Sequence, residues 1–172
     1  MFARFGTGLS CRLKGTSGVS LVELIVTLTI LAILASVVMP MAQMTARRTR
    51  EIELRRNLRT LRTAIDDYKK AWDKMPAGPN KADTESGYPK DLQTLIDGKD
   101  FGDLKAGKQK FLRRKIYDPF SPPGSSGDEQ WGWELRSYKD KPDSSKWGGE
   151  DVFDVYSKSE GTAIDGSKYK DW

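Results

Sequence analysis

The side chains that could do chemistry in this chain are mainly acidic, and they lie near both of its ends. Glu23 stands alone among the apolar residues 21–39, where a carboxylate is costly unless a partner uses it. At the other end, five side chains within eighteen residues could serve a hard cation such as calcium, which prefers oxygen ligands: Asp154, Ser157, Glu160, Asp165 and Asp171. Their spacing is not that of an EF-hand, and they could equally form an acidic, turn-rich surface loop that binds nothing.

The composition excludes several kinds of active site. The chain has no histidine and a single cysteine, Cys11, so neither a Ser-His-Asp nor a Cys-His catalytic set can be assembled. An internal disulfide cannot form, and a structural zinc site lacks its usual ligands. No phosphate-binding loop is visible either. The sequence therefore predicts a protein that is not an enzyme.

The apolar residues are concentrated at positions 19–41, and the remainder of the chain is polar for its size. As a helix, residues 19–40 would measure about 30 Å, the thickness of the hydrocarbon core of a bilayer. Three interpretations are open: a cleaved secretory signal, a plain membrane anchor, and a prepilin signal whose apolar helix is kept. A secretory signal should have a shorter apolar region and a small-residue cleavage site, whereas this run ends at VVMPMAQ. A plain anchor leaves Glu23 and the preceding KGTSG unexplained.

The segment KGTSGVSLVEL resembles the leader of type IV pilins and pseudopilins. In that superfamily a basic leader ends in glycine, and the mature apolar helix has glutamate at its fifth position. The resemblance makes Gly18 the last leader residue and Val19 the mature N-terminus, with Glu23 fifth and Pro40 twenty-second, where these proteins often have proline. Val19 departs from the pattern, because the family more often begins with Phe or Met.

This resemblance implies processing followed by assembly. A prepilin peptidase would cut after Gly18 and N-methylate Val19. The new α-amine is mostly charged at neutral pH, and Glu23 of a neighbouring copy would receive it as the helices gather into a helical filament. In a lone anchor, Glu23 would instead snorkel to the lipid headgroups.

The basic residues ahead of the apolar run set the expected orientation. Arg4, Arg12 and Lys14 predict a cytoplasmic N-terminus, so the chain after Pro40 would cross to the periplasm. We expect a single-pass protein of the bacterial inner membrane that assembles into a periplasmic or cell-surface filament. The expected parts are a cleaved leader, the membrane and assembly half of a spine helix, its amphipathic half, and a periplasmic globular part, over residues 1–18, 19–40, 41–75 and 76–172.

A second helical pattern follows Pro40. Apolar residues recur at spacings of three and four, namely Leu54, Leu58, Leu61, Ile65, Tyr68, Trp72 and Met75, and we call them the apolar stripe. The whole helix is expected over about residues 20–75, with a kink or a locally melted turn at Pro40. The stripe could be the seam of a coiled-coil dimer. We expect it instead to carry the C-terminal sheet, because that segment also needs a partner.

The C-terminal part predicts a loop over residues 76–90, a short helix in YPKDLQTLIDG, and strands in WGWELRSY and DVFDVYS. Trp131, Trp133 and Leu135 alternate onto one face, as do Phe153 and Val155. An antiparallel meander of about three strands laid on the stripe gives an α+β fold, with one long spine helix and a small sheet.

The arginines of ARRTREIELRRNLRTLR allow several partners. A basic run before a heptad stripe resembles a bZIP layout, but the membrane segment upstream argues against DNA, and we expect no nucleic-acid partner. Those nearest the membrane would meet anionic lipid headgroups: Arg47, Arg48 and Arg50. The others would pair with acids on adjacent subunits: Arg55, Arg56, Arg59 and Arg62. The alternative is a solvated face with pairs such as Glu51–Arg55.

The rear of the chain resembles the major pseudopilin of type II secretion. The motifs YP–DLQTLI, DPF, WGWELRS and FDVYSKSEG–DG–DW follow that family's order, although DPFSPPG departs from its DPWG form and the usual glycine-rich insertion is missing. The resemblance implies a filament subunit supporting protein export, with minor pseudopilins and an inner-membrane assembly platform as partners. It also implies calcium in the final loop, held by Asp165 and Asp171, with Ser157 or nearby carbonyls completing the shell.

The departures leave other functions open. A type IV pilus pilin or minor pilin would serve adhesion, motility or DNA uptake. A monomeric, membrane-anchored binding protein is a further alternative, and it would not need Glu23.

Overall fold

The computed structural model describes residues 18–75, 84–102, 107–121, 130–144 and 146–172. Four residues discussed above, Arg4, Cys11, Arg12 and Lys14, lie outside these ranges, as does most of the loop predicted at 76–90. The chain forms two compact units, residues 1–43 and 44–172. Their elements confirm the α+β class.

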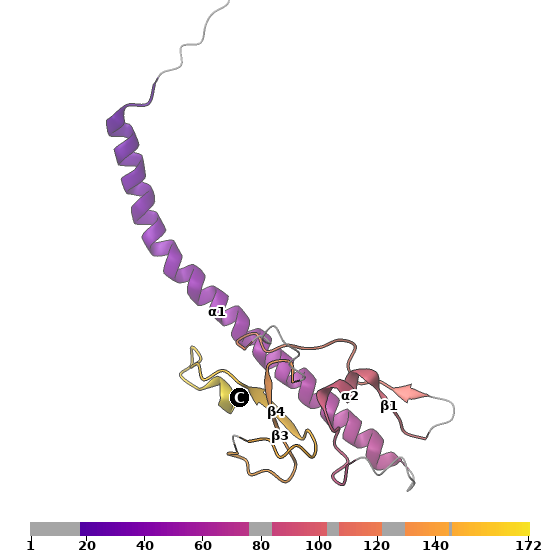
Figure 1. Ribbon diagram of the computed structural model, residues 1–172. Helices are drawn as coiled ribbons and strands as arrows, with labels where there is room; N and C mark the ends of the chain where they lie inside the picture. The colour runs from indigo at the N-terminus through magenta and orange to yellow at the C-terminus, as the bar shows by residue number, and fades with distance from the viewer. Residues whose placement is uncertain (1–17, 76–83, 103–106, 122–129, 145) are drawn as a thin grey trace, which may run out of the picture. The chain divides into compact units, whose positions relative to one another are not determined.

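The longest element is helix α1, Leu21–Lys74 (Figure 1). It begins and ends within one residue of the predicted helix. The helix continues through Pro40, so the locally melted turn expected there is not seen. Proline removes only one N–H donor, and the turns on either side keep their own hydrogen bonds.

The apolar residues of the first unit have no core to enter. Every large apolar side chain from Val19 to Met41 is between 51 and 73% exposed. An apolar surface of this extent needs an apolar environment, either lipid or other helices.

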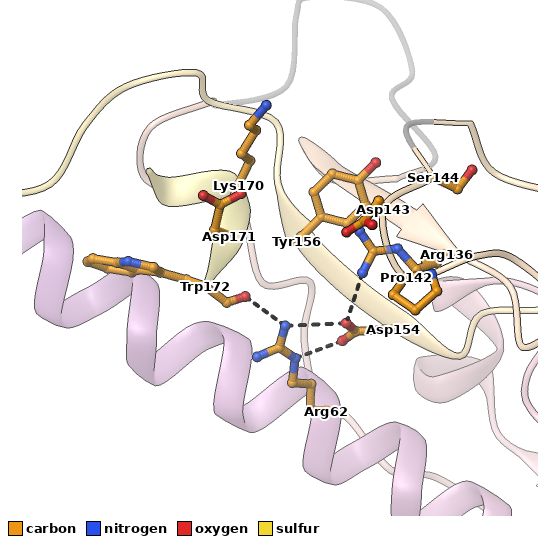
Figure 2. A pocket seen from close by; sticks show the side chains of 10 residues that line it. All are labelled: Arg62, Arg136, Pro142, Asp143, Ser144, Asp154, Tyr156, Lys170, Asp171 and Trp172. Carbon is orange, nitrogen blue, oxygen red and sulfur yellow. Dashed lines mark hydrogen bonds and ion pairs between the residues drawn. The ribbon is translucent and has the colours of Figure 1, made fainter. Parts of the chain in front are cut away.

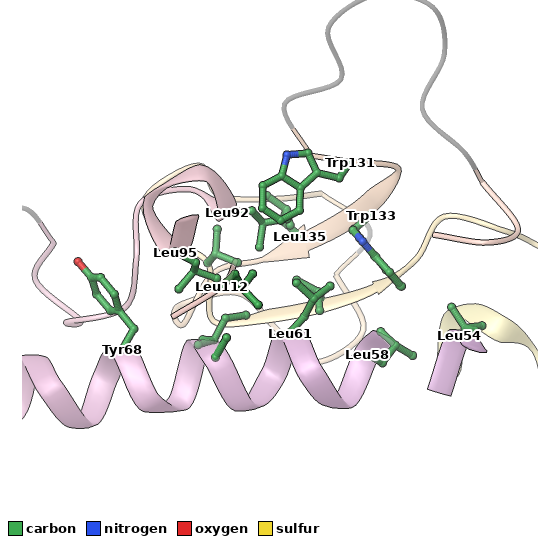
Figure 3. Close-up of a cluster of buried hydrophobic side chains, with 14 of the residues drawn as sticks. Leu54, Leu58, Leu61, Tyr68, Leu92, Leu95, Leu112, Trp131, Trp133 and Leu135 are labelled. Atoms are coloured by element: carbon green, nitrogen blue, oxygen red, sulfur yellow. The ribbon is translucent and has the colours of Figure 1, made fainter. Parts of the chain in front are cut away.

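The second unit buries the apolar stripe (Figure 3). Leu54, Leu61 and Ile65 are fully buried, and the side chains that cover the stripe come from helix α2, strands β3 and β4 and the loop at Leu112. This confirms the prediction that the C-terminal part packs on the stripe. Because the stripe is covered within the chain, it is not available as a dimer seam.

Helix α2, Leu92–Asp97, is capped at its N-terminus by Asp91, whose carboxylate accepts a hydrogen bond from the backbone N–H of Thr94 at 2.7 Å. It ends at Gly98, which has a φ of 77°. Strands β1, Lys99–Asp100, and β2, Lys108–Gln109, form a two-residue antiparallel pair that the sequence did not predict.

Strands β3, Trp133–Arg136, and β4, Asp154–Ser157, pair antiparallel beside the second half of α1 (Figure 1). Two separate two-stranded sheets thus replace the expected three-stranded meander in the described parts of the chain. Trp131 and Gly132 both have positive φ, so the chain turns there instead of extending β3. A Cβ on residue 132 would overlap the carbonyl oxygen of Ser121, which explains the glycine.

The expectation that Phe153 and Val155 share a buried face is wrong for Phe153. Val155 is fully buried, whereas Phe153 lies just before β4 and is 41% exposed. Its ring packs edge-on against Tyr88 and Tyr138, with centroids 5.1 and 5.5 Å away. The regular strand therefore begins only at Asp154, after Phe153.

Candidate functional site

The predicted cleavage bond lies in an open segment ahead of α1. Gly18, Val19 and Ser20 precede the helix, and Val19 is 72% exposed. A Cβ on Gly18 would meet no atom within 4 Å, so the fold itself leaves room for a larger residue. A peptidase can therefore reach the bond between Gly18 and Val19, and any demand for glycine must come from the enzyme.

Glu23 lies in the first turn of α1, where the other polar side chains of residues 21–39 are satisfied within the helix. Thr27, Thr29 and Ser36 donate their hydroxyls to carbonyls three or four residues earlier, at 2.7–2.9 Å. Within the described residues, the carboxylate of Glu23 forms no hydrogen bond or ion pair. It is the single unsatisfied polar side chain of residues 21–39 within the described part of the chain.

Helix α1 contains one stretch that is long and apolar enough to cross a membrane. Its 18-residue window has a mean hydropathy of 2.6, and none of that window is buried within the chain. The stretch and the acid at its beginning fit a membrane-anchored, single-pass protein.

A second acid of α1, Glu51, was missed as a functional residue and anchors the C-terminal segment. Its Oε1 accepts hydrogen bonds from the N–H of Ile164 at 2.9 Å and from the hydroxyl of Tyr169 at 2.8 Å. Arg47 approaches the same oxygen at 3.5 Å and also donates to Tyr169 and to the carbonyl of Thr162. We call this set the Glu51 clasp: Arg47, Glu51, Thr162, Ile164 and Tyr169.

The clasp explains the protonation of Tyr169. Burial raises the pKa of Tyr169 above its ordinary value of 10.0; Arg47 opposes this rise, and Glu51 adds to it. The phenol is therefore neutral at physiological pH and can donate to Glu51. Because its folded pKa is raised, the contribution of Tyr169 to stability is complete below pH 10 and is lost as the pH rises through the folded value.

Two arginines predicted to pair with adjacent subunits are bound within the chain instead. Arg55 contacts Asp165 at 2.8 Å, and its guanidinium lies 4.1 Å from the ring centroid of Trp172. This also corrects the suggested Glu51–Arg55 pair, since Glu51 is held by Arg47. Helical spacing would allow Arg55 to pair with Glu51, but the C-terminal segment places Asp165 beside Arg55 instead.

Arg62 lines a hollow of about 760 Å³ between α1, β4 and the short 3₁₀ helix η2, Tyr169–Asp171 (Figure 2). It contacts Asp154 at 2.7 Å and donates to the carbonyl of Trp172 at 2.8 Å. Arg136 reaches the same carboxylate at 3.8 Å. Asp154 is thus shared by two arginines, and the hollow is lined by a structural ion-pair network.

The DPF motif meets β4 through a buried carboxylate. Asp118 is 1% exposed and accepts hydrogen bonds from the N–H of Phe120 at 2.8 Å and from the hydroxyl of Ser157 at 2.6 Å. The backbone N–H of Asp118 also bonds the carbonyl of Trp131. Asp118 thus joins three segments that are far apart in the sequence.

The structure does not gather the three predicted calcium ligands around one point. Ser157 is fully buried, and its hydroxyl is donated to Asp118. Asp165 is exposed and accepts hydrogen bonds from Ser167 and Arg55, which lower the pKa of its carboxyl. Asp171 is exposed on η2. Among the described residues, no three acidic or cysteine side chains have a metal-binding arrangement. As placed, these donors do not fit one ion, and calcium binding stays a prediction from the resemblance.

A melting measurement tests this prediction. Because Arg55 already neutralises Asp165 and the Glu51 clasp holds the loop, we expect the full chain in detergent to melt at the same temperature with millimolar calcium and with chelator. An Asp171→Asn variant should behave identically. A calcium-dependent rise in Tm that this substitution abolishes would establish the predicted site.

Comparison with known proteins adds one finding. Residues 13–39 match a family described as the prokaryotic N-terminal methylation motif. The matched segment contains Gly18, Val19 and Glu23, and it supports a type IV pilin-like protein that is processed by prepilin peptidase. Neither a curated protein nor a solved structure matches the chain.

Proposed function

We propose that the chain is a non-enzymatic, structural subunit of a helical filament that is drawn from the bacterial inner membrane. A prepilin peptidase removes residues 1–18 and methylates Val19. The product rests in the membrane with its C-terminal part in the periplasm until other copies recruit it. The filament is of the type II secretion pseudopilus kind and supports protein export, together with minor pseudopilins and an inner-membrane assembly platform.

The observation that carries this proposal is the unpaired carboxylate of Glu23 on an exposed apolar helix. A monomeric anchor gains nothing from an acid at that depth. In a filament, the charged amine of Val19 on a neighbouring copy supplies the missing partner. The same contact can then repeat from each copy to the next along the filament.

The choice of a pseudopilus over a type IV pilus rests on the C-terminal part. The DPF and VYS segments, which resemble pseudopilin motifs, meet directly through Asp118 and Ser157. This contact gives both motifs a shared structural role and favours the secretion branch.

Mass spectrometry of the purified protein tests the processing step. In cells with a prepilin peptidase, we expect a mature chain that begins at Val19 and carries the mass of one added methyl group. In cells without the peptidase, the leader should remain. An intact leader in both strains contradicts the proposal.

Gly18→Asp provides the matched variant. The fold has open space at this position, so the substitution should leave folding unchanged while it blocks cleavage. A Gly18→Asp chain that is still cut at the same bond would remove the peptidase from the proposal.

A further inference from the structure

Exposed apolar side chains gather in one groove of the second unit. Met44 and Ile52 of α1 are 62 and 61% exposed, and Ile164 of the C-terminal segment is 48% exposed. All three line a groove of about 570 Å³, together with Arg48, and we call it the Ile164 groove. Among the described residues of this unit, every other large non-aromatic apolar side chain is at least partly buried. The exposed aliphatic surface of the unit is therefore concentrated here.

The fold holds Ile164 toward solvent. Its backbone N–H donates to Glu51 at 2.9 Å, and the adjacent Ala163 is buried. The N–H of Ala163 donates to the carbonyl of Ser167 at 2.7 Å, which closes the loop around Ile164. The side chain of Ile164 cannot turn into the core without the loss of these hydrogen bonds, so its exposure is built into the fold.

The charges around the groove leave a positive excess. Its two carboxylates are already bound within the chain, Glu51 in the Glu51 clasp and Asp165 by Arg55. Arg48 is exposed, and its guanidinium has no hydrogen bond or ion pair within the described residues. The surroundings of the groove therefore attract anions. Over residues 44–56 and 160–168, the exposed charged groups without such a contact in the described residues are four cations and two anions: Arg48, Arg50, Arg56 and Lys168, and Glu53 and Glu160.

The chain ties this groove to the membrane-spanning stretch. Met44 follows Met39, the end of the apolar run, by five residues, and an extended chain spans at most about 3.6 Å per residue. Met44 therefore lies within about 18 Å of the end of the run, however the two units are arranged. The polar layer on each side of the hydrocarbon is about 5–8 Å thick. Lipid headgroups are thus always within reach of the groove.

We infer that the Ile164 groove contacts the headgroup region of an anionic phospholipid membrane while the subunit is anchored there. Ile164 and Ile52 enter the interfacial layer, and Arg48 binds the lipid phosphates. Arg47 is bound in the Glu51 clasp, so Arg48 and Arg50 remain of the three arginines expected to meet headgroups. The inference needs the membrane anchor and does not need the filament.

The tether favours lipid over a soluble partner. Because the chain joins the groove to the membrane-spanning stretch, the groove meets the membrane surface at an effective concentration on the order of millimolar. A shallow contact by a few apolar side chains and arginines is weak by itself and is populated at such a concentration. An anionic phospholipid also offers both chemistries that the groove needs, an anion for Arg48 and hydrocarbon for Ile52 and Ile164.

Quenching by lipids that carry a spin label on the headgroup tests the contact in the full chain. Ile164→Cys, combined with Cys11→Ser, is labelled with a fluorophore and placed in anionic lipid nanodiscs that hold one copy each. We expect quenching at position 164 to be at least about twice that at a label on Tyr138→Cys, an exposed position outside the groove. Equal quenching at the two positions overturns the inference. Shielding of position 164 that needs several copies in one disc assigns the groove to a second copy and overturns the lipid contact.

Variants of the groove separate its apolar part from its charge, with the label moved to Ile52→Cys in the Cys11→Ser chain. Ile164→Asp should lower the quenching there at least about twofold, whereas Tyr138→Asp should leave it unchanged. Arg48→Glu should remove the excess of quenching in anionic over zwitterionic discs. Unchanged quenching in an Ile164→Asp chain whose tryptophan fluorescence shows the native fold overturns the contact. Polymer does not enter this measurement, so the lipid contact and the proposed filament can fail separately.

Discussion

Replacing Glu23 by glutamine is expected to abolish filament growth while the protein remains in the membrane. Glutamine keeps the size of the side chain but removes the charge that the amine of Val19 needs in a desolvated interface. Leaving one member of a buried ion pair alone costs about 3–5 kcal/mol, which is more than about a hundredfold in the equilibrium for adding a copy. The measurement is the amount of sedimentable polymer relative to the membrane-bound pool.

The control for this prediction comes from the same helix. Ser36 donates its hydroxyl to the carbonyl of Ile33 and has no need of a neighbour, so Ser36→Ala should assemble normally. Wild-type amounts of polymer from the Glu23→Gln chain would contradict the charge-pair account and favour a lone anchor.

Replacing Glu51 by alanine should cause the largest loss of stability among the acids of α1. The substitution leaves the N–H of Ile164 and the hydroxyl of Tyr169 without their acceptor. We expect the free energy of unfolding to fall by about 2–4 kcal/mol. Denaturant melts of the full chain in detergent, followed by tryptophan fluorescence, measure the change.

Two further variants separate the clasp from a general effect on the helix. Glu51→Gln keeps an acceptor oxygen and should lose only about 1 kcal/mol. Glu53→Ala removes an exposed acid two residues away and should change stability by less than about 0.5 kcal/mol. Equal losses from Glu51→Ala and Glu53→Ala would show that the clasp does not hold the C-terminal segment.

The spine helix and its packing could be predicted because their signals are local. Spacings of three and four from Leu54 onward place the apolar side chains on one helix face, whatever later covers them. The same reasoning found Glu23, since one acid in an apolar run is visible in the sequence alone.

The contacts of the C-terminal segment could not be predicted in this way. Glu51 and Tyr169 are separated by 118 residues, and nothing in the spacing of either one points to the other. For Arg55, the helix offered a nearby acid at the right interval, whereas the fold brings Asp165 from 110 residues away. Likewise, the alternation of Trp131, Trp133 and Leu135 predicts a strand that begins at Trp131. The turn at Trp131 and Gly132 instead makes β3 begin at Trp133.

The back-bonded hydroxyls of Thr27, Thr29 and Ser36 bear on how such a helix changes surroundings. Because those hydroxyls are already hydrogen-bonded, residues 21–39 present an apolar surface to their surroundings, apart from the carboxylate of Glu23. When this helix moves from the acyl chains into a bundle of identical helices, one apolar environment replaces another. Dehydration then changes the free energy of the helix little. In the proposed filament, polymerisation would therefore draw its directionality from close packing, from the single charge and from work supplied by other components.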